Sequence, residues 1–184
     1  TKDPTAKFER LTELTLGESG TQNIGIAFGG PIKNNQLKYR MVLRSDYSDG
    51  FRKNIYLNKS DTSKKDELTL RYKLHWDLNQ TTKIKLLFSQ VDIDDPADIW
   101  TIDGSLNTLS DRPGMDSQKT DSFGLKIFKD LEHFDIQSYT SATNTDIVFS
   151  YDADWGNPES HYPYTYDYFS ETFRKRDTLR QELR

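Results

Sequence analysis

The sequence predicts an all-β fold, an antiparallel up-and-down meander of about eight strands in the wall of a transmembrane β-barrel. Apolar and polar residues alternate along several segments of about ten residues, as on strands whose two faces meet different surroundings. The connections between these segments alternate between short and long. Aromatic residues make up 12% of the chain although its hydrophobic content is only 34%, which suits a one-layer sheet with one wet face.

The first strands are predicted in the N-terminal quarter. Residues 8–16 form a candidate first strand, and residues 17–20 turn into a hairpin that spans residues 21–47. Along this hairpin, apolar side chains share one face and small or cationic ones share the other. The tight turn is expected at residues 29–36, where glycine, proline and asparagine supply turn conformations.

Two further hairpins and a last strand follow. The second hairpin occupies residues 68–89 and turns at 78–81. The third occupies residues 122–145, turns at 129–133, and loses its alternation toward its end. Residues 176–184 are the eighth strand. Three long polar connections separate these units, at residues 48–67, 92–119 and 151–173.

The alternation divides the strand residues into an apolar set and a cationic set on opposite faces. In a membrane barrel, the apolar set faces lipid and the polar set faces the lumen. The predicted lipid-facing residues are Leu70, Tyr72, Leu74, Trp76, Ile84, Leu86 and Phe88. The predicted lumen-facing residues are Lys38, Arg40, Arg44, Arg71, Lys73 and His75, together with Lys83 and Lys85. These cations either guide an anionic ligand or, in the favoured interpretation, are solvated or paired with carboxylates.

The connection at residues 151–173 is the best candidate for ligand contact. Binding residues concentrate on loops that a rigid scaffold carries, and flat aromatic side chains pack well on a chelate or a sugar. The candidates are Trp155, Tyr162, Tyr164, Tyr166 and Tyr168. The alternative is that these aromatics pack the loops against one another or mark the membrane interface.

No metal site is predicted. His75, His133 and His161 lack the spacing of metal ligands. An acidic cluster at residues 92–98 has the oxygen ligands that Ca²⁺ prefers, but it lacks the glycine and the terminal glutamate of an EF-hand loop. A solvated acidic loop is the favoured interpretation of Asp92, Asp94, Asp95 and Asp98.

Composition and motifs argue against several other classes. The net charge of -4 argues against a general nucleic-acid binder. The chain has no cysteine, which excludes disulfides and thiolate metal sites. It has no Gly-x-Ser-x-Gly motif, phosphate loop or dinucleotide fingerprint, so we predict neither an enzyme nor a cofactor. It also lacks the run of about eighteen apolar residues that a transmembrane helix needs.

Blocks along essentially the whole chain resemble TonB-dependent outer-membrane receptors. The opening TKDPTAKFE resembles the junction where the last strand of the plug passes into the first barrel strand. LTLGESGTQNIGIAFGGPIKNNQLKYRMVLRSDYSDGF is similar to the first barrel strands, with their Gly-Pro-Ile turn and Asp-Gly-Phe. DELTLRYKLHWDLNQTTKIKLLFSQVD is similar to the following hairpin. FDIQSYTSATNTDIVFSYDADW and RDTLRQELR resemble later strands and the loop between them.

This resemblance implies that residues 1–6 are the end of the plug and its junction to the barrel. Residues 7–184 are then the N-terminal strands of the receptor barrel. A complete barrel of this family has about twenty-two strands, so the chain is expected to be a fragment and its sheet part of a large barrel. The plug and the TonB box would lie outside it.

The resemblance also implies a function, the uptake of a scarce ligand across the bacterial outer membrane. The ligand is most often a ferric siderophore, and other members carry cobalamin, haem, nickel chelates or oligosaccharides. The expected partners are the TonB–ExbB–ExbD complex, which acts through the plug, the ligand and the lipid of the outer membrane. No nucleic-acid partner is expected.

Two alternatives come from other classes. A small closed eight-stranded barrel with a structural or adhesive role would pair the strands that contain Phe8 and Leu183. A soluble carbohydrate-binding or lipocalin-like domain would instead bury the apolar set of residues 70–88 in a dry core.

Overall fold

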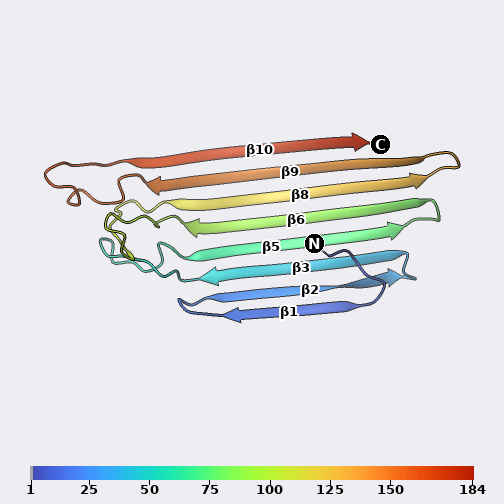
Figure 1. The fold of residues 1–184 in the computed structure, drawn as a ribbon, viewed down its shortest axis with the longest axis horizontal. Helices are drawn as coiled ribbons and strands as arrows, with labels where there is room; N and C mark the ends of the chain where they lie inside the picture. Colours follow the sequence, from blue (N-terminus) through green and yellow to red (C-terminus); the bar gives the residue numbers. More distant parts are fainter. Residues whose placement is uncertain (1) are drawn as a thin grey trace.

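The structure is a computed structural model that describes residues 2–184. This part of the chain contains ten strands and no helix. Eight strands form one antiparallel sheet in which each strand pairs with its neighbours along the chain (Figure 1). The predicted all-β class and the eight-stranded antiparallel meander are confirmed. No helix in residues 2–184 has the length and apolar character to cross a membrane.

The strands of this sheet follow one another in space as they do in sequence. In that order they are β1 (Glu9–Leu16), β2 (Gln22–Lys33), β3 (Leu37–Ser48), β5 (Lys65–Asp77), β6 (Thr82–Pro96), β8 (Met115–Asp130), β9 (Asp135–Asp152) and β10 (Phe169–Leu183). Two short strands, β4 (Lys53–Asn54) and β7 (Asn107–Thr108), form a separate parallel pair.

The connections lie at the two ends of the sheet according to their length. Residues 34–36, 78–81 and 131–134 make the short turns at one end. Residues 49–64, 97–114 and 153–168 make the long loops at the other end, together with the turn at 17–21 (Figure 1). The predicted alternation of short and long connections is therefore present.

Most strands extend further into the loop end than predicted. β6 continues to Pro96, β8 begins at Met115, and β9 continues to Asp152. The antiparallel ladder is made of backbone hydrogen bonds, so it continues beyond the point where apolar side chains stop alternating. The three long loops are correspondingly shorter than the polar connections in the sequence.

The first turn also differs from the prediction. β2 runs through to Lys33, and the turn is reduced to residues 34–36. Asn34 and Asn35 have φ values of 43° and 57°, and the Gln36 N–H donates to the Lys33 carbonyl at 2.9 Å. Positive φ at both central residues is what a type I′ hairpin turn requires, so the asparagines alone make this turn.

Gly29 and Gly30 lie inside β2 because another backbone comes close to each of them. A Cβ atom on Gly29 would lie 2.3 Å from the Tyr39 carbonyl oxygen, and one on Gly30 would lie 2.9 Å from the Phe8 Cα. Only glycine allows such approaches. Gly29 and Gly30, which were expected in a turn, therefore allow neighbouring backbone to pack closely against β2.

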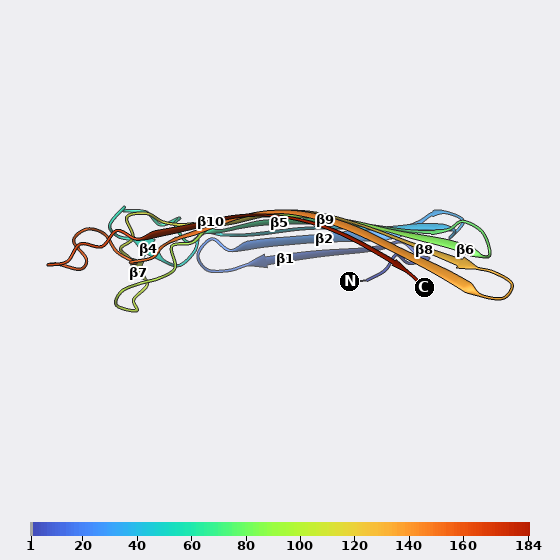
Figure 2. The same ribbon diagram turned by 90° about the horizontal axis from the view of Figure 1, so that it is seen from above.

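The sheet is open at both edges. β1 and β10 are the edge strands, and neither pairs with a further strand of residues 2–184. The pairing that a small closed barrel requires, between the strands of Phe8 and Leu183, is not formed. Figure 2 shows the sheet as a shallow arch whose edge strands bend toward the side on which the N-terminus lies.

The sheet has no hydrophobic core. Ala27 and Ala97 are the only buried hydrophobic residues among those described. Trp76 and Phe88 are 42% and 38% exposed, and the other members of the predicted apolar set are half-buried. The dry core that the soluble-domain alternative needs is not formed by this chain.

Candidate functional site

The strand register gathers the apolar side chains on one face of the sheet. Directly opposed residues of neighbouring strands point to the same face. One such row runs across four strands through Tyr39, Leu74, Leu86 and Leu125. The neighbouring rows contain Met41, Tyr72, Phe88 and Phe123 on one side and Leu37, Trp76, Ile84 and Ile127 on the other.

This face is mostly apolar on the strands from β2 to β8, and it also carries Leu14 on β1 and Leu179 and Leu183 on β10. On β9, Ser138, Thr140 and Ala142 continue its rows, and on β10 Gln181 lies opposite Thr140. The Thr140 hydroxyl bonds with the Gln181 side chain, and Gln181 Nε2 donates to the Ser138 hydroxyl at 3.0 Å. The weak alternation predicted for this hairpin thus corresponds to a polar strip along β9. The hydroxyl groups of Ser138 and Thr140 in this strip hydrogen-bond with Gln181.

The opposite face carries the basic residues. The register aligns Lys38, His75, Lys85, Lys126 and Tyr139 in one row, and places Arg40 beside Lys73 in the next. Lys38 pairs with Asp77 at 3.4 Å, and Arg40 lies 3.8 Å from Glu9. Basic side chains of strands far apart in sequence therefore share one face.

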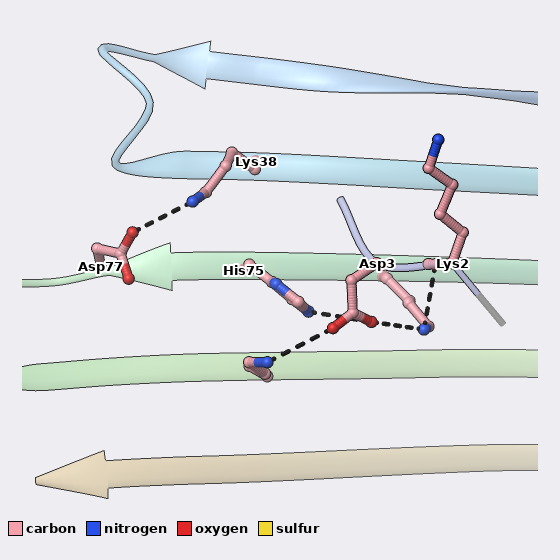
Figure 3. A network of polar contacts seen from close by, with 7 residues as sticks. Lys2, Asp3, Lys38, His75 and Asp77 are labelled. Atoms are coloured by element: carbon pink, nitrogen blue, oxygen red, sulfur yellow. Dashed lines mark hydrogen bonds and ion pairs between the residues drawn. The ribbon is translucent and has the colours of Figure 1, made fainter. Parts of the chain in front are cut away.

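The N-terminal segment crosses this basic face. Its Asp3 carboxylate accepts a hydrogen bond from Lys73 Nζ at 2.8 Å (Figure 3). The same carboxylate lies 3.8 Å from His75 Nε2 and 3.6 Å from Lys85 Nζ. Lys73 also donates to the Lys2 carbonyl at 3.3 Å. One acidic side chain thus attaches the segment to two strands.

The ionised form of Asp3 is favoured by these contacts. The hydrogen bond from Lys73 lowers the pKa of Asp3 below its ordinary value, partial burial opposes this shift, and the nearby charges of Lys73, His75 and Lys85 add to it. A carboxylate held by a charge-assisted bond is a stronger anchor than a neutral one.

A cavity of about 390 Å³ opens beside Asp3. Lys73, His75, Lys85, Lys126 and Tyr139 are among the residues that line it. The Lys126 ammonium lies 5.7 Å from the centre of the Tyr139 ring, within the range of a cation–π contact. The cavity is therefore a basic site on the polar face. Alternation places Lys126 on this face, but it does not indicate that Asp3 or Tyr139 belongs to the site.

The long loops pack together into a second candidate region, which we call the loop head (residues 49–64, 97–114 and 153–168). Its centre is polar rather than apolar. Asn54 Nδ2 donates to the Asp98 carboxylate at 2.9 Å and to the Ser110 carbonyl at 2.8 Å. Thr108 donates to the same carboxylate at 2.7 Å. These residues are almost completely buried, so they hold the first two loops together.

The third loop joins the head through its first residues and through the end of β9. The Ser110 hydroxyl donates to Asp152 at 2.7 Å, and Asn157 Nδ2 donates to the Leu109 carbonyl at 3.0 Å. The Asp111 N–H donates to the Gly156 carbonyl at 2.9 Å. Buried polar groups that are hydrogen-bonded in this way fix a loop in one arrangement.

The predicted aromatic candidates lie on the exposed part of this third loop. Tyr162 is 89% exposed, and Trp155, Tyr164 and Tyr168 are also exposed. Tyr166 stacks on Tyr168 with ring centres 6.0 Å apart. The loop head therefore presents a group of aromatic surfaces beyond the sheet, which no other part of the described chain covers.

The acidic cluster of residues 92–98 does not converge on one point. Asp92 lies 3.7 Å from Lys119, Asp95 accepts a hydrogen bond from the Asp66 N–H at 2.6 Å, and Asp98 belongs to the loop head. No three of the described His, Asp and Glu residues are grouped as metal ligands would be. Asp98 is buried, which differs from the solvated loop that the sequence favoured.

No model of a known protein family matches the sequence, and no curated protein matches it significantly.

Proposed function

We propose that this chain forms the N-terminal strands of the barrel of a TonB-dependent outer-membrane receptor. Residues 7–184 would lie in the barrel wall and residues 1–6 at its junction with the plug. The observation that carries the proposal is the polarity of the two faces. The face crossed by the N-terminal segment carries Lys73, His75 and Lys85, and the opposite face carries the apolar rows.

The curvature of the sheet supports the same arrangement. The N-terminal segment lies on the side toward which the edge strands bend (Figure 2), so the basic face is the concave one. A soluble barrel buries apolar side chains on its concave side, whereas a membrane barrel has a polar lumen and an apolar outer band. An apolar convex face with no covering layer fits lipid.

The height of the apolar face is compatible with an outer membrane. On β5 it extends from Leu68 to Trp76, eight residue steps or about 27 Å along the strand. A strand tilt of about 40° reduces this to roughly 20 Å across the bilayer. The bacterial outer membrane is thinner than average, and the exposed Trp76 lies at the end of the band, where barrels carry an aromatic girdle.

The open edges support membership of a larger barrel. An exposed, unpaired strand edge is a site of association, and closed barrels remove it by pairing their first and last strands. β1 and β10 each have fully formed ladders on their inner side only. Further strands of a receptor barrel would pair with these edges.

In this proposal the loop head faces the exterior and the short turns face the periplasm, as in other outer-membrane barrels. The aromatic side chains of the third loop, Tyr162 and Tyr164 foremost, would contact the ligand, an iron chelate. Lys38, Arg40, Arg44, Arg71, Lys73 and His75 would line the lumen. The TonB–ExbB–ExbD complex would supply energy through the plug.

Uptake of a ferric chelate by cells that carry this protein tests the function. Cells would be given a radiolabelled ferric siderophore, with the gene intact, deleted, or restored on a plasmid. The proposal predicts that uptake is lost on deletion, regained on restoration, and abolished when an uncoupler collapses the proton gradient. Uptake that is unchanged by deletion for every chelate class supplied would contradict it.

A further inference from the structure

We propose that the basic cavity on the polar face binds a small soluble anion with two or more adjacent negative charges, and that Asp3 occupies part of this site. The site consists of Lys73, His75, Lys85 and Lys126 around the 390 Å³ cavity. Its expected ligands are diphosphates and compact polycarboxylates. This site lies on the strands and is separate from the aromatic loop head.

The position of Asp3 shows how an acidic group is held there. Its two carboxylate oxygens contact different partners, Oδ1 with Lys73 at 2.8 Å and Oδ2 with Lys85 at 3.6 Å. Lysine binds carboxylate and phosphate oxygens as a compact charge with three donors. A diphosphate has more acceptor oxygens than one carboxylate, so it can engage these ammonium groups and Lys126 together.

The charge around the cavity is not balanced by Asp3 alone. Lys73, Lys85 and Lys126 contribute three positive charges, and Asp3 contributes one negative charge, which leaves a net charge of about +2 when His75 is neutral. Within residues 2–184, Lys126 takes part in a contact with the Tyr139 ring but in no ion pair. A cavity lined by one sign of charge concentrates ions of the other sign.

The place of the cavity in the fold favours a soluble ligand over a lipid headgroup. Its basic residues point to the face opposite the apolar rows. His75 lies two residues before the end of β5, and Lys85 lies three residues after the start of β6. The cavity therefore lies near the short turns, at the end of the sheet away from the loop head.

Asp3 is expected to compete with such an anion, because both need Lys73 and Lys85. Removing the Asp3 charge should strengthen binding, and removing the lysine charges should weaken it. A charge change elsewhere on the same face should do neither. Asp46 provides this control, because it pairs with Arg44 at 2.7 Å and lies about 20 Å from Lys73 along the strands.

Calorimetric titration of the 184-residue chain with pyrophosphate, in a zwitterionic detergent, tests this site. We expect Asp3→Asn to bind pyrophosphate about fivefold tighter than the unmodified chain. The double variant Lys73→Met, Lys85→Met should bind about tenfold weaker, and Asp46→Asn should bind as the unmodified chain does. Lys126→Met, which leaves the Asp3 contacts in place, should bind severalfold weaker and serves if the double variant does not fold.

The inference is overturned if pyrophosphate does not bind, or if Asp3→Asn binds no tighter than the unmodified chain. It is also overturned if Asp46→Asn increases the affinity for pyrophosphate as much as Asp3→Asn does, because the increase would then reflect the net charge of the chain alone. These outcomes concern only the basic face. They are independent of the ligand-uptake test, so the anion site and the transport function can fail separately.

Discussion

Asp3 and Lys73 are seventy residues apart in the chain, and their side chains form an ion pair of 2.8 Å. The contact attaches the N-terminal segment to the middle strands of the sheet. It also distinguishes the two faces, because the segment lies on the basic face alone.

The attachment of the N-terminal segment should depend on pH. Because Lys73 lowers the pKa of Asp3 below its ordinary value of 3.8, the ionised carboxylate is favoured in the attached state. The stabilisation of the attached segment by Asp3 is then fully present above the ordinary pKa. It is lost as the pH falls through the lowered pKa of Asp3. Spin labels on Ala6→Cys and Ser141→Cys should give a narrow distance distribution at about pH 6 and a broad one near pH 2.

The variant Asp3→Asn identifies the group responsible. It should give the broad distribution at both pH values, whereas Asp46→Asn should behave as the unmodified chain does. A narrow distribution in Asp3→Asn at about pH 6 would show that Asp3 does not hold the segment.

Strand packing at Gly29 should not tolerate a side chain. The Cβ of Gly29→Ala would lie 2.3 Å from the Tyr39 carbonyl, so β2 and β3 must move apart, at a cost of about 1–3 kcal/mol in the free energy of unfolding. Gly25→Ala on the same strand is the control, because its nearest neighbour would be Glu13 Cβ at an ordinary 3.5 Å. Urea unfolding followed by tryptophan fluorescence measures both, and equal effects would contradict the close approach.

The loop head should depend on Asn54. Replacing it by alanine leaves the Ser110 carbonyl without a partner in a buried site, which costs about 1–3 kcal/mol. The Asp98 carboxylate loses one of its two donors and keeps the bond from Thr108. Hydrogen exchange measured by mass spectrometry should become faster in residues 49–64 and 97–114 and stay unchanged in the sheet.

Asn107→Ala is the matched control for Asn54, since Asn107 is exposed on the paired strand β7. It should leave exchange in both loops unchanged. If the two variants exchange alike, the buried network does not hold the loops together.

A charge on the apolar face should be costly in lipid. Under the proposed function, Leu74→Arg places a guanidinium among Tyr39 and Leu86 between the middle of the bilayer and its interface. The cost should be about 1–3 kcal/mol, below the value at the midplane. Ser122→Arg on the basic face should change the free energy of unfolding by less than about 0.5 kcal/mol. Urea titration in phospholipid vesicles compares them, and a larger cost for Ser122→Arg would reverse the assignment of the faces.

The faces and the order of the strands were predictable because they follow from periodicity. Tyr72 and Phe88 lie directly opposite each other. A slip of one residue would move one of them to the other face, so the alternation limits the register to steps of two residues. Strand ends were less predictable. Asp94, Asp95 and Pro96 belong to β6 although nothing in their side chains indicates a strand, because the ladder depends on backbone groups.

The contacts that define the sites could not be predicted. Asp3 reaches Lys73 only because the N-terminal segment folds back over the sheet, and this path leaves no periodic signal. Asn54 and Asp98 are 44 residues apart on two irregular loops, so their pairing depends on the loop conformations. Gly29 looked like a turn residue, since a glycine required by close approach and one required by positive φ look the same in sequence.

In the proposed arrangement the apolar face meets lipid and the basic face meets water, and cysteine labelling distinguishes these two environments. The chain has no cysteine, so each position from Leu70 to Asp77 can carry a single thiol in cells or vesicles. A membrane-confined reagent should label positions 70, 72, 74 and 76, and a water-soluble reagent should label positions 71, 73 and 75. If the apolar positions react with neither reagent, their side chains form a dry protein core, and the transport proposal falls with the membrane.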